Sequence, residues 1–60
     1  MTQLQIIREK KGITQAELAR RVKVARSTVW QTEQRGIKTI RTAKKYAQVL
    51  ECNPRDLLDI

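Results

Sequence analysis

The 60-residue chain has no histidine and no phenylalanine, and it contains only one cysteine, one proline and two glycines. A single cysteine, Cys52, excludes an internal disulfide, and one thiol without histidine cannot complete a tetrahedral zinc site. The lack of histidine removes the commonest general base, the acidic residues are scattered, and neither glycine forms a phosphate-cradling loop. We therefore expect no metal, no cofactor and no enzymatic activity.

Long apolar runs are also missing. Apolar residues never exceed three in a row, whereas a membrane-spanning helix needs about 20. The N-terminus lacks the apolar stretch of a signal peptide. We expect a cytoplasmic protein that enters no membrane and forms one small domain over residues 1–60. Its core must rely on efficient helix packing or on oligomerisation.

Basic residues are abundant and unevenly placed. The chain has 13 Lys and Arg against 6 Asp and Glu, a net charge of +7. Residues 1–50 hold twelve basic and three acidic residues, whereas residues 51–60 hold one basic and three acidic residues. A basic body with an acidic end suggests one face that binds a polyanion such as nucleic acid. Solubility alone is the simpler alternative.

Capping patterns divide the chain into short helices. No segment alternates for long between apolar and polar residues, so strands are not expected. Thr2 and Thr14 are each followed three residues later by Gln or Glu, which is the pattern of a capping box. Glycine is typical of helix C-termini and proline of first turns. The five expected helices are one from the cap Thr2 to Gly12, one from the cap Thr14 through about Arg21, one over about 26–34 before Gly36, one from the cap Thr39 through Leu50, and a short last one opened by Asn53 and Pro54.

The second and third expected helices and their short connection have the arrangement of a helix-turn-helix. One helix braces across the phosphate backbone, and the next projects its polar face into the major groove. The segments "GITQAELA" (12–19), "RSTV" (26–29) and "EQRG" (33–36) resemble the phage-repressor-like helix-turn-helix family of the Cro/CI or XRE type. The resemblance covers residues 4–36 and, more weakly, 42–58. It implies an all-α, compact five-helix lambda-repressor-like domain that binds DNA.

Three positions depart from the residues usual in that family. Lys23 stands where the turn usually has glycine, and a left-handed conformation is strained there. Ala25 replaces the polar cap of the recognition helix, which costs about 1 kcal/mol. Thr32 replaces an apolar residue and thins the core. All three bear on the angle and rigidity of the third helix.

The outer face of the third helix supplies the candidate contacts to bases. Arginine binds guanine O6 and N7, glutamine binds adenine N6 and N7, and serine adapts to either. Arg26, Ser27 and Gln31 are the expected base contacts. Ser27 and Gln31 lie one turn apart and so reach successive bases. Arg26, at the start of the helix, is equally suited to hold a phosphate.

A second group of residues is expected to hold the phosphate backbone. Gln15 follows the cap of the second helix, where free N–H groups and partial positive charge attract an anion, and the resemblance implies the same role. Its alternative is an exposed surface residue. Thr28 is suited to a phosphate or to a thymine methyl group. The expected phosphate contacts are Gln15, Thr28, Trp30, Lys38, Arg41, Lys23 and Lys44.

Two residues of the third helix, Trp30 and Glu33, each allow two orientations. If Val29 and Thr32 point inward, Trp30 does not, so we expect a partly exposed indole whose N–H is directed at a phosphate. A core position is the alternative, since Thr32 leaves room. Glu33 should point away from phosphate, with Arg8 as its simplest partner. An exposed glutamate is the alternative.

The C-terminal end is apolar beyond the needs of a short last helix. Leu57, Leu58 and Ile60, with Cys52 nearby, are candidates for a dimer interface, because repressors of this size usually bind two half-sites about 34 Å apart. Packing onto the first helix is the equal alternative for these side chains.

Together these features predict a sequence-specific regulator that binds double-stranded DNA. We expect a bacterial or phage repressor that binds a palindromic operator as a homodimer and is associated with the nucleoid. The rival hypothesis is a protein-interaction module, such as an antitoxin or an anti-repressor, and a regulatory protein partner is compatible with both.

Overall fold

Helices follow the capping signals of the sequence through residues 1–59, the part of the chain that the computed structural model describes. The helices are α1 (Gln3–Lys10), α2 (Gln15–Val22), α3 (Arg26–Arg35) and α4 (Ile40–Leu50), and a 3₁₀ turn, η1, follows at Pro54–Leu57. Within that part of the chain the sole strand-like feature is one parallel bridge between Ile37 and Leu58.

Threonine caps begin three of the four α-helices. The hydroxyl oxygens of Thr2, Thr14 and Thr39 each accept the backbone N–H three residues later. These bonds satisfy donors that the first helical turn leaves without a partner. Ala25 at the start of α3 makes no such bond, which confirms the predicted loss of a cap on that helix.

Left-handed residues end α1, α2 and α4. Gly12, Lys23 and Glu51 have φ angles of 71°, 67° and 55°. After α2, the N–H of Val24 donates to the carbonyl of Ala19 at 3.0 Å, which is the bond of a Schellman motif. Lys23 therefore adopts the left-handed turn without being glycine, and the connection between α2 and α3 is short and tight.

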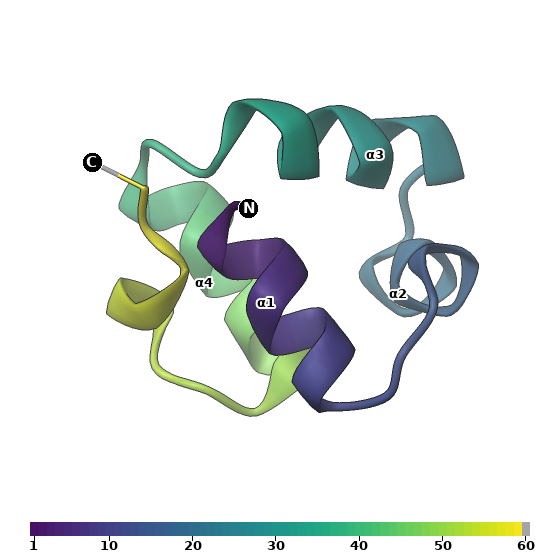
Figure 1. Cartoon of the computed structure of the whole chain (residues 1–60), viewed down its shortest axis with the longest axis horizontal. Coiled ribbons are helices and arrows are strands. Elements are labelled where there is room, and N and C mark those ends of the chain that lie inside the picture. The colour runs from purple at the N-terminus through teal and green to yellow at the C-terminus, as the bar shows by residue number, and fades with distance from the viewer. Residues whose placement is uncertain (60) are drawn as a thin grey trace.

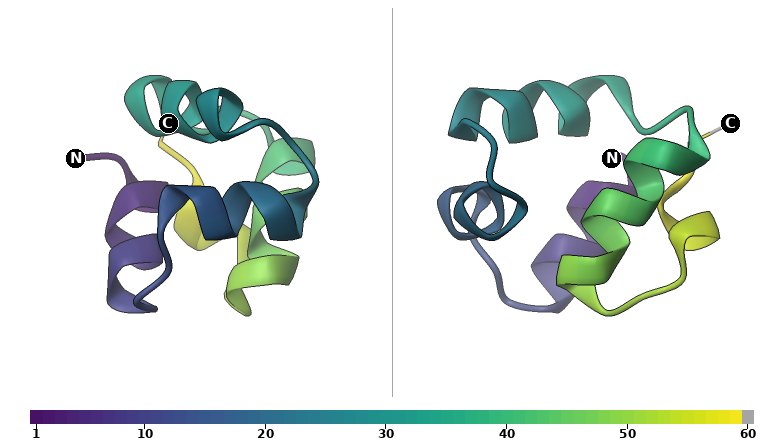
Figure 2. Two further views of the ribbon diagram at one scale, coloured as in Figure 1. Left: turned by 90° about the vertical axis from the view of Figure 1, so that its right-hand side faces the viewer. Right: turned by 180° about the vertical axis from the view of Figure 1, so that it is seen from behind.

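α3 lies along one side of the molecule, over the other helices (Figure 1). Its first turns lie over α2 and its last turn leads down to the start of α4, an arrangement that the views in Figure 2 repeat. α2 packs against α3 and α4, and α1 packs against α3 and η1. The fully buried side chains at the centre are Leu4, Leu18, Val29, Ala43 and Leu57.

The expectation of five helices is wrong at the C-terminus, where the last element is a single 3₁₀ turn. Asn53 caps it and Pro54 opens it. Leu58 then becomes extended and bridges Ile37, and the N–H of Asp59 donates to the carbonyl of Ile37 at 2.9 Å. The pairing of Leu58 and Asp59 with Ile37 ends η1 after its four residues.

The burial of the C-terminal leucines also corrects part of the predicted dimer interface. Leu57 is fully buried in the core of the single chain, so its side chain is not available on the surface. Leu58 is half-buried and packs against the same core. Ile60 lies outside the described residues. For Leu57 the alternative of packing within the chain holds.

Replacing Glu51 with glycine should stabilise the domain. A side chain in the left-handed region costs about 1–2 kcal/mol, part of which glycine returns through its freer unfolded chain. Glu51→Gly should raise the free energy of unfolding by about 1 kcal/mol and the melting temperature by about 4–8 °C, measured by circular dichroism. Glu51→Ala, which keeps the strained backbone but removes the charge, is the control. Equal effects of the two variants would show that charge, not backbone conformation, is responsible.

Candidate nucleic-acid interface

α3 separates its side chains into a narrow inner face and a broad outer face. With 3.6 residues per turn, Val29 and Glu33 share one side, and both are buried. Among the described residues of α3, Glu33 is the sole acid, so no negative charge is exposed on the helix. The outer face of α3 consists of the exposed residues Arg26, Ser27, Thr28, Trp30, Gln31, Gln34 and Arg35.

One edge of this outer face forms a hollow with the start of α2. The hollow has a volume of about 390 Å³ and is lined by Gln15, Arg26, Ser27 and Trp30. Trp30 is 53% exposed, which confirms a partly exposed indole and contradicts the core alternative. Four residues predicted to contact DNA therefore meet at one place.

The opposite edge of the outer face forms a second hollow, of about 290 Å³, with the start of α4. Thr28, Gln31 and Lys38 line it, together with Arg35 and Thr39, which the sequence reasoning missed. The signal for Arg35 was present in the spacing, because residues 28, 31 and 35 follow one stripe of a helix.

The N-terminus of a helix lies at each hollow. Gln15 is the first residue of α2, behind the cap Thr14, and Arg41 lies in the first turn of α4, behind the cap Thr39. Free N–H groups and the helix dipole favour an anion at both ends. The outer face of α3 is thus flanked on both edges by groups that suit phosphate.

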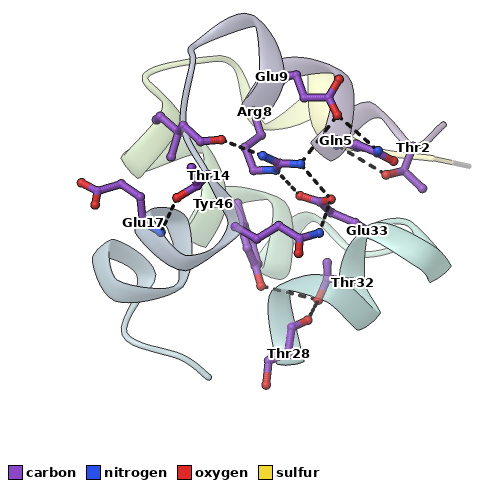
Figure 3. Close-up of polar contacts among 12 residues, drawn as sticks. Thr2, Gln5, Arg8, Glu9, Thr14, Glu17, Thr28, Thr32, Glu33 and Tyr46 are labelled. Carbon is purple, nitrogen blue, oxygen red and sulfur yellow. Dashed lines mark hydrogen bonds and ion pairs between the residues drawn. The ribbon is translucent and has the colours of Figure 1, made fainter. Parts of the chain in front are cut away.

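A buried ion pair fixes α3 against α1. The Nε atom of Arg8 donates to Oε2 of Glu33 at 2.5 Å, and its Nη2 donates to Oε1 at 3.4 Å (Figure 3). Arg8 is 9% exposed and Glu33 is 2% exposed. The Nη1 atom of Arg8 also donates to the carbonyl of Ile13 at 2.7 Å, which ties the loop before α2 to the same pair. The predicted partnership of Arg8 and Glu33 is confirmed.

Gln15 completes this buried cluster. Its Nε2 atom donates to Oε1 of Glu33 at 2.9 Å, and the residue is half-buried, which contradicts the alternative of a free surface glutamine. No sequence pattern indicates that Gln15 and Glu33 meet. The bond directs the amide nitrogen inward and leaves the side-chain oxygen and the backbone N–H as the groups that can face a ligand.

Thr32 has a structural role that its polar character obscured in the sequence. Its hydroxyl donates to the carbonyl of Thr28 at 2.8 Å and accepts from the hydroxyl of the buried Tyr46 at 3.5 Å. A tyrosine hydroxyl needs a partner when it is buried. The position that thins the apolar core thus satisfies a polar group from α4.

The remaining predicted cations lie outside the two hollows or at their rim. Lys23 and Lys44 are exposed and line neither hollow. Lys38 is exposed, and its Nζ atom donates to the carbonyl of Asp59 at 2.7 Å. Glu17 is neutralised on α2 by ion pairs with Arg20 and Arg21.

The described part of the chain shows no metal-binding cluster, no membrane-spanning helix and no activated thiol. No three His, Cys, Asp or Glu residues gather there as a metal site, and none of its helices has the length and hydropathy of a bilayer span. Burial, aided by the nearby Asp56, raises the pKa of the Cys52 thiol, which Lys11 partly offsets. The thiol therefore stays protonated at neutral pH and is a poor nucleophile.

A comparison with known proteins agrees with this geometry. A family model described as helix-turn-helix, of the Cro/CI or XRE type, matches residues 4–57. Neither the curated proteins nor the solved structures gave a match to the chain. The family match includes α2, α3 and both hollows.

Breaking the buried ion pair should destabilise the fold severely. Arg8→Met leaves the Glu33 carboxylate buried with only Gln15 as its partner, and such losses cost about 3–5 kcal/mol. The double variant Arg8→Met/Glu33→Leu should recover most of this loss, because no charge then stays buried. Urea unfolding followed by circular dichroism measures both effects.

Arg21→Met is the matched control, because it breaks an exposed ion pair with Glu17 and should cost less than about 1 kcal/mol. A loss from Arg8→Met no larger than this control would contradict the structural role of the buried pair.

Proposed function

Because this chain belongs to the helix-turn-helix family whose model matches residues 4–57, we propose that it is a transcriptional repressor that binds a palindromic operator as a homodimer. The family match supports the assignment of this protein as a DNA-binding regulator. The finer proposal rests mainly on one observation. The outer face of α3 is polar, free of exposed acid, and flanked by a helix N-terminus at each edge.

Dimensions support insertion of α3 into the major groove. A helix with its side chains is about 10–12 Å across, and the groove is about 12 Å wide. α3 lies along one side of the molecule, and no other helix of residues 1–59 covers its outer side (Figures 1 and 2). The outer rims of the two hollows then lie toward the two phosphate backbones that border the groove, and their inner rims toward the bases.

The proposed base-reading surface lies where the two hollows approach each other on the outer face. Ser27 lines the first hollow and Gln31 the second, and both are exposed, one turn apart. Gln31 can bind adenine N6 and N7 with both ends of its amide, and Ser27 can donate or accept. Arg26, at the first turn, is placed to reach a guanine or the neighbouring phosphate.

Phosphate contacts are proposed at both edges of the groove. At the α2 edge, Gln15 offers its backbone N–H and Trp30 its indole N–H. At the α4 edge, Thr28 and Lys38 hold the opposite backbone together with Arg41 in the first turn of α4. We add Arg35 and Thr39 to this group because they line the same hollow. Lys23 and Lys44 act at longer range through their charge.

A homodimer is proposed because one protomer reads too little DNA. The chain measures 25 × 20 × 20 Å, which is less than one turn of B-DNA, about 34 Å. Two copies bound one turn apart on the same face of the duplex double the number of bases read. The half-buried Leu58 at the C-terminal end is the proposed contact between them, together with Ile60.

Trp30 should report binding directly, since it is the single tryptophan and lies on the outer face of α3. We expect red-shifted emission in the free protein and a change in intensity on addition of a duplex selected from a random pool. The affinity should fall steeply with salt as counterions are released. A blue-shifted emission, indifferent to any selected duplex, would contradict the interface. Salt-insensitive binding to a protein, with none to DNA, would favour an interaction module instead.

Mutations of a base contact and of a phosphate contact should have different effects on DNA binding. Gln31→Ala should weaken binding to the selected site by about 1–3 kcal/mol and relax the preference at one base position. Arg41→Ala should weaken binding to all sequences alike and lower the slope of log affinity against log salt by about 1 for each protomer. Gel shifts with the selected and a scrambled duplex measure both effects, and Lys45→Ala, on an exposed part of α4 outside both hollows, is the control. Identical behaviour of the two variants would contradict this division.

A further inference from the structure

Trp30 is the one large apolar side chain that the described outer face of α3 leaves in solvent. It is 53% exposed, and the other large exposed apolar residues, Met1 and Ile40, lie outside α3. Its neighbours on the face are serine, threonine, glutamine and arginine. Exposed indole surface of this extent favours burial against an apolar group. A phosphate bound at the indole N–H would leave the faces of the ring uncovered.

The hollow beside Trp30 combines this apolar wall with a polar rim. Its other lining residues are Gln15, Arg26 and Ser27, and its volume is about 390 Å³. Such a hollow suits a planar group that presents an apolar substituent among polar atoms. On the major-groove edges of DNA, the C5-methyl group of thymine is the one apolar substituent.

We propose that the hollow lined by Trp30 and Arg26 receives the C5-methyl group of a thymine, which makes Trp30 a specificity-determining residue. This inference rests on the proposed function, because it requires α3 in the major groove. The ring face contacts the methyl group, and the N–H at the ring edge stays available for a phosphate.

The helix geometry fixes the position of this thymine in the site. Arg26 precedes Trp30 by four residues, so the two side chains share one side of α3 and lie about 6 Å apart along its axis. Successive base pairs are about 3.4 Å apart. With α3 lying along the groove as proposed, the thymine lies within about two base pairs of the base or phosphate that Arg26 contacts.

Deoxyuridine provides the test, because it differs from thymidine only in lacking the methyl group. The probe is a duplex selected by the wild-type protein from a random pool, followed by a series in which each thymidine in turn is replaced by deoxyuridine. At one position in each half-site, the replacement should weaken binding about fourfold, the effect expected for one buried methyl group. Trp30→Ala should bind all members of this series equally.

Gln34→Ala is the matched control, since Gln34 is exposed on α3 and lines neither hollow. It should keep the fourfold discrimination of the wild-type protein. Wild-type binding that is indifferent to every deoxyuridine replacement would overturn the thymine assignment while leaving DNA binding intact. Discrimination that survives in Trp30→Ala would overturn the role of Trp30. Failure of the pool to yield any bound duplex would instead overturn the proposed function.

Discussion

The ion pair between Arg8 and Glu33 is the constraint on which the remaining geometry depends. Both groups are buried, so each charge needs a partner to offset its lost hydration. Arg8 comes from α1 and Glu33 from α3, and Gln15 adds the first residue of α2 to the same carboxylate. These bonds require three helices to meet at one point. They therefore set how far α3 stands from the body and how it is rotated.

This polar attachment compensates for the scarcity of apolar residues on α3. Val29 is its one apolar residue in the core, and its start has no side-chain cap. A helix held by apolar packing alone would need a wider inner stripe. Directional hydrogen bonds to Glu33 and the bond between Thr32 and Tyr46 hold α3 with few inward positions. Seven of its side chains are consequently left for the outer face.

Local signals were sufficient to predict most of the fold. Threonine caps and the glycines before α2 and after α3 placed the four α-helices, and the expected inward direction of Val29 placed the outer face. Contacts between distant polar residues were harder to predict, because glutamine and threonine are ambiguous without their surroundings. Nothing in the sequence indicates that Gln15 reaches Glu33 or that Thr32 serves Tyr46. The prediction of a fifth helix is wrong for a similar reason, because the pairing of Leu58 with Ile37, which follows the 3₁₀ turn, is a long-range contact.

The bond from Gln15 to Glu33 links the fold to its proposed activity. The same carboxylate that fixes α3 also holds the first side chain of α2, so the start of α2 and the angle of α3 cannot change independently. Trp30 and Arg26 share the adjoining hollow with Gln15, and their position relative to the start of α2 is therefore set from inside the protein. A preorganised surface of this kind loses less side-chain freedom on binding than a mobile one. The buried charge, although costly to the stability of so small a domain, serves to keep the proposed DNA-binding face in one geometry.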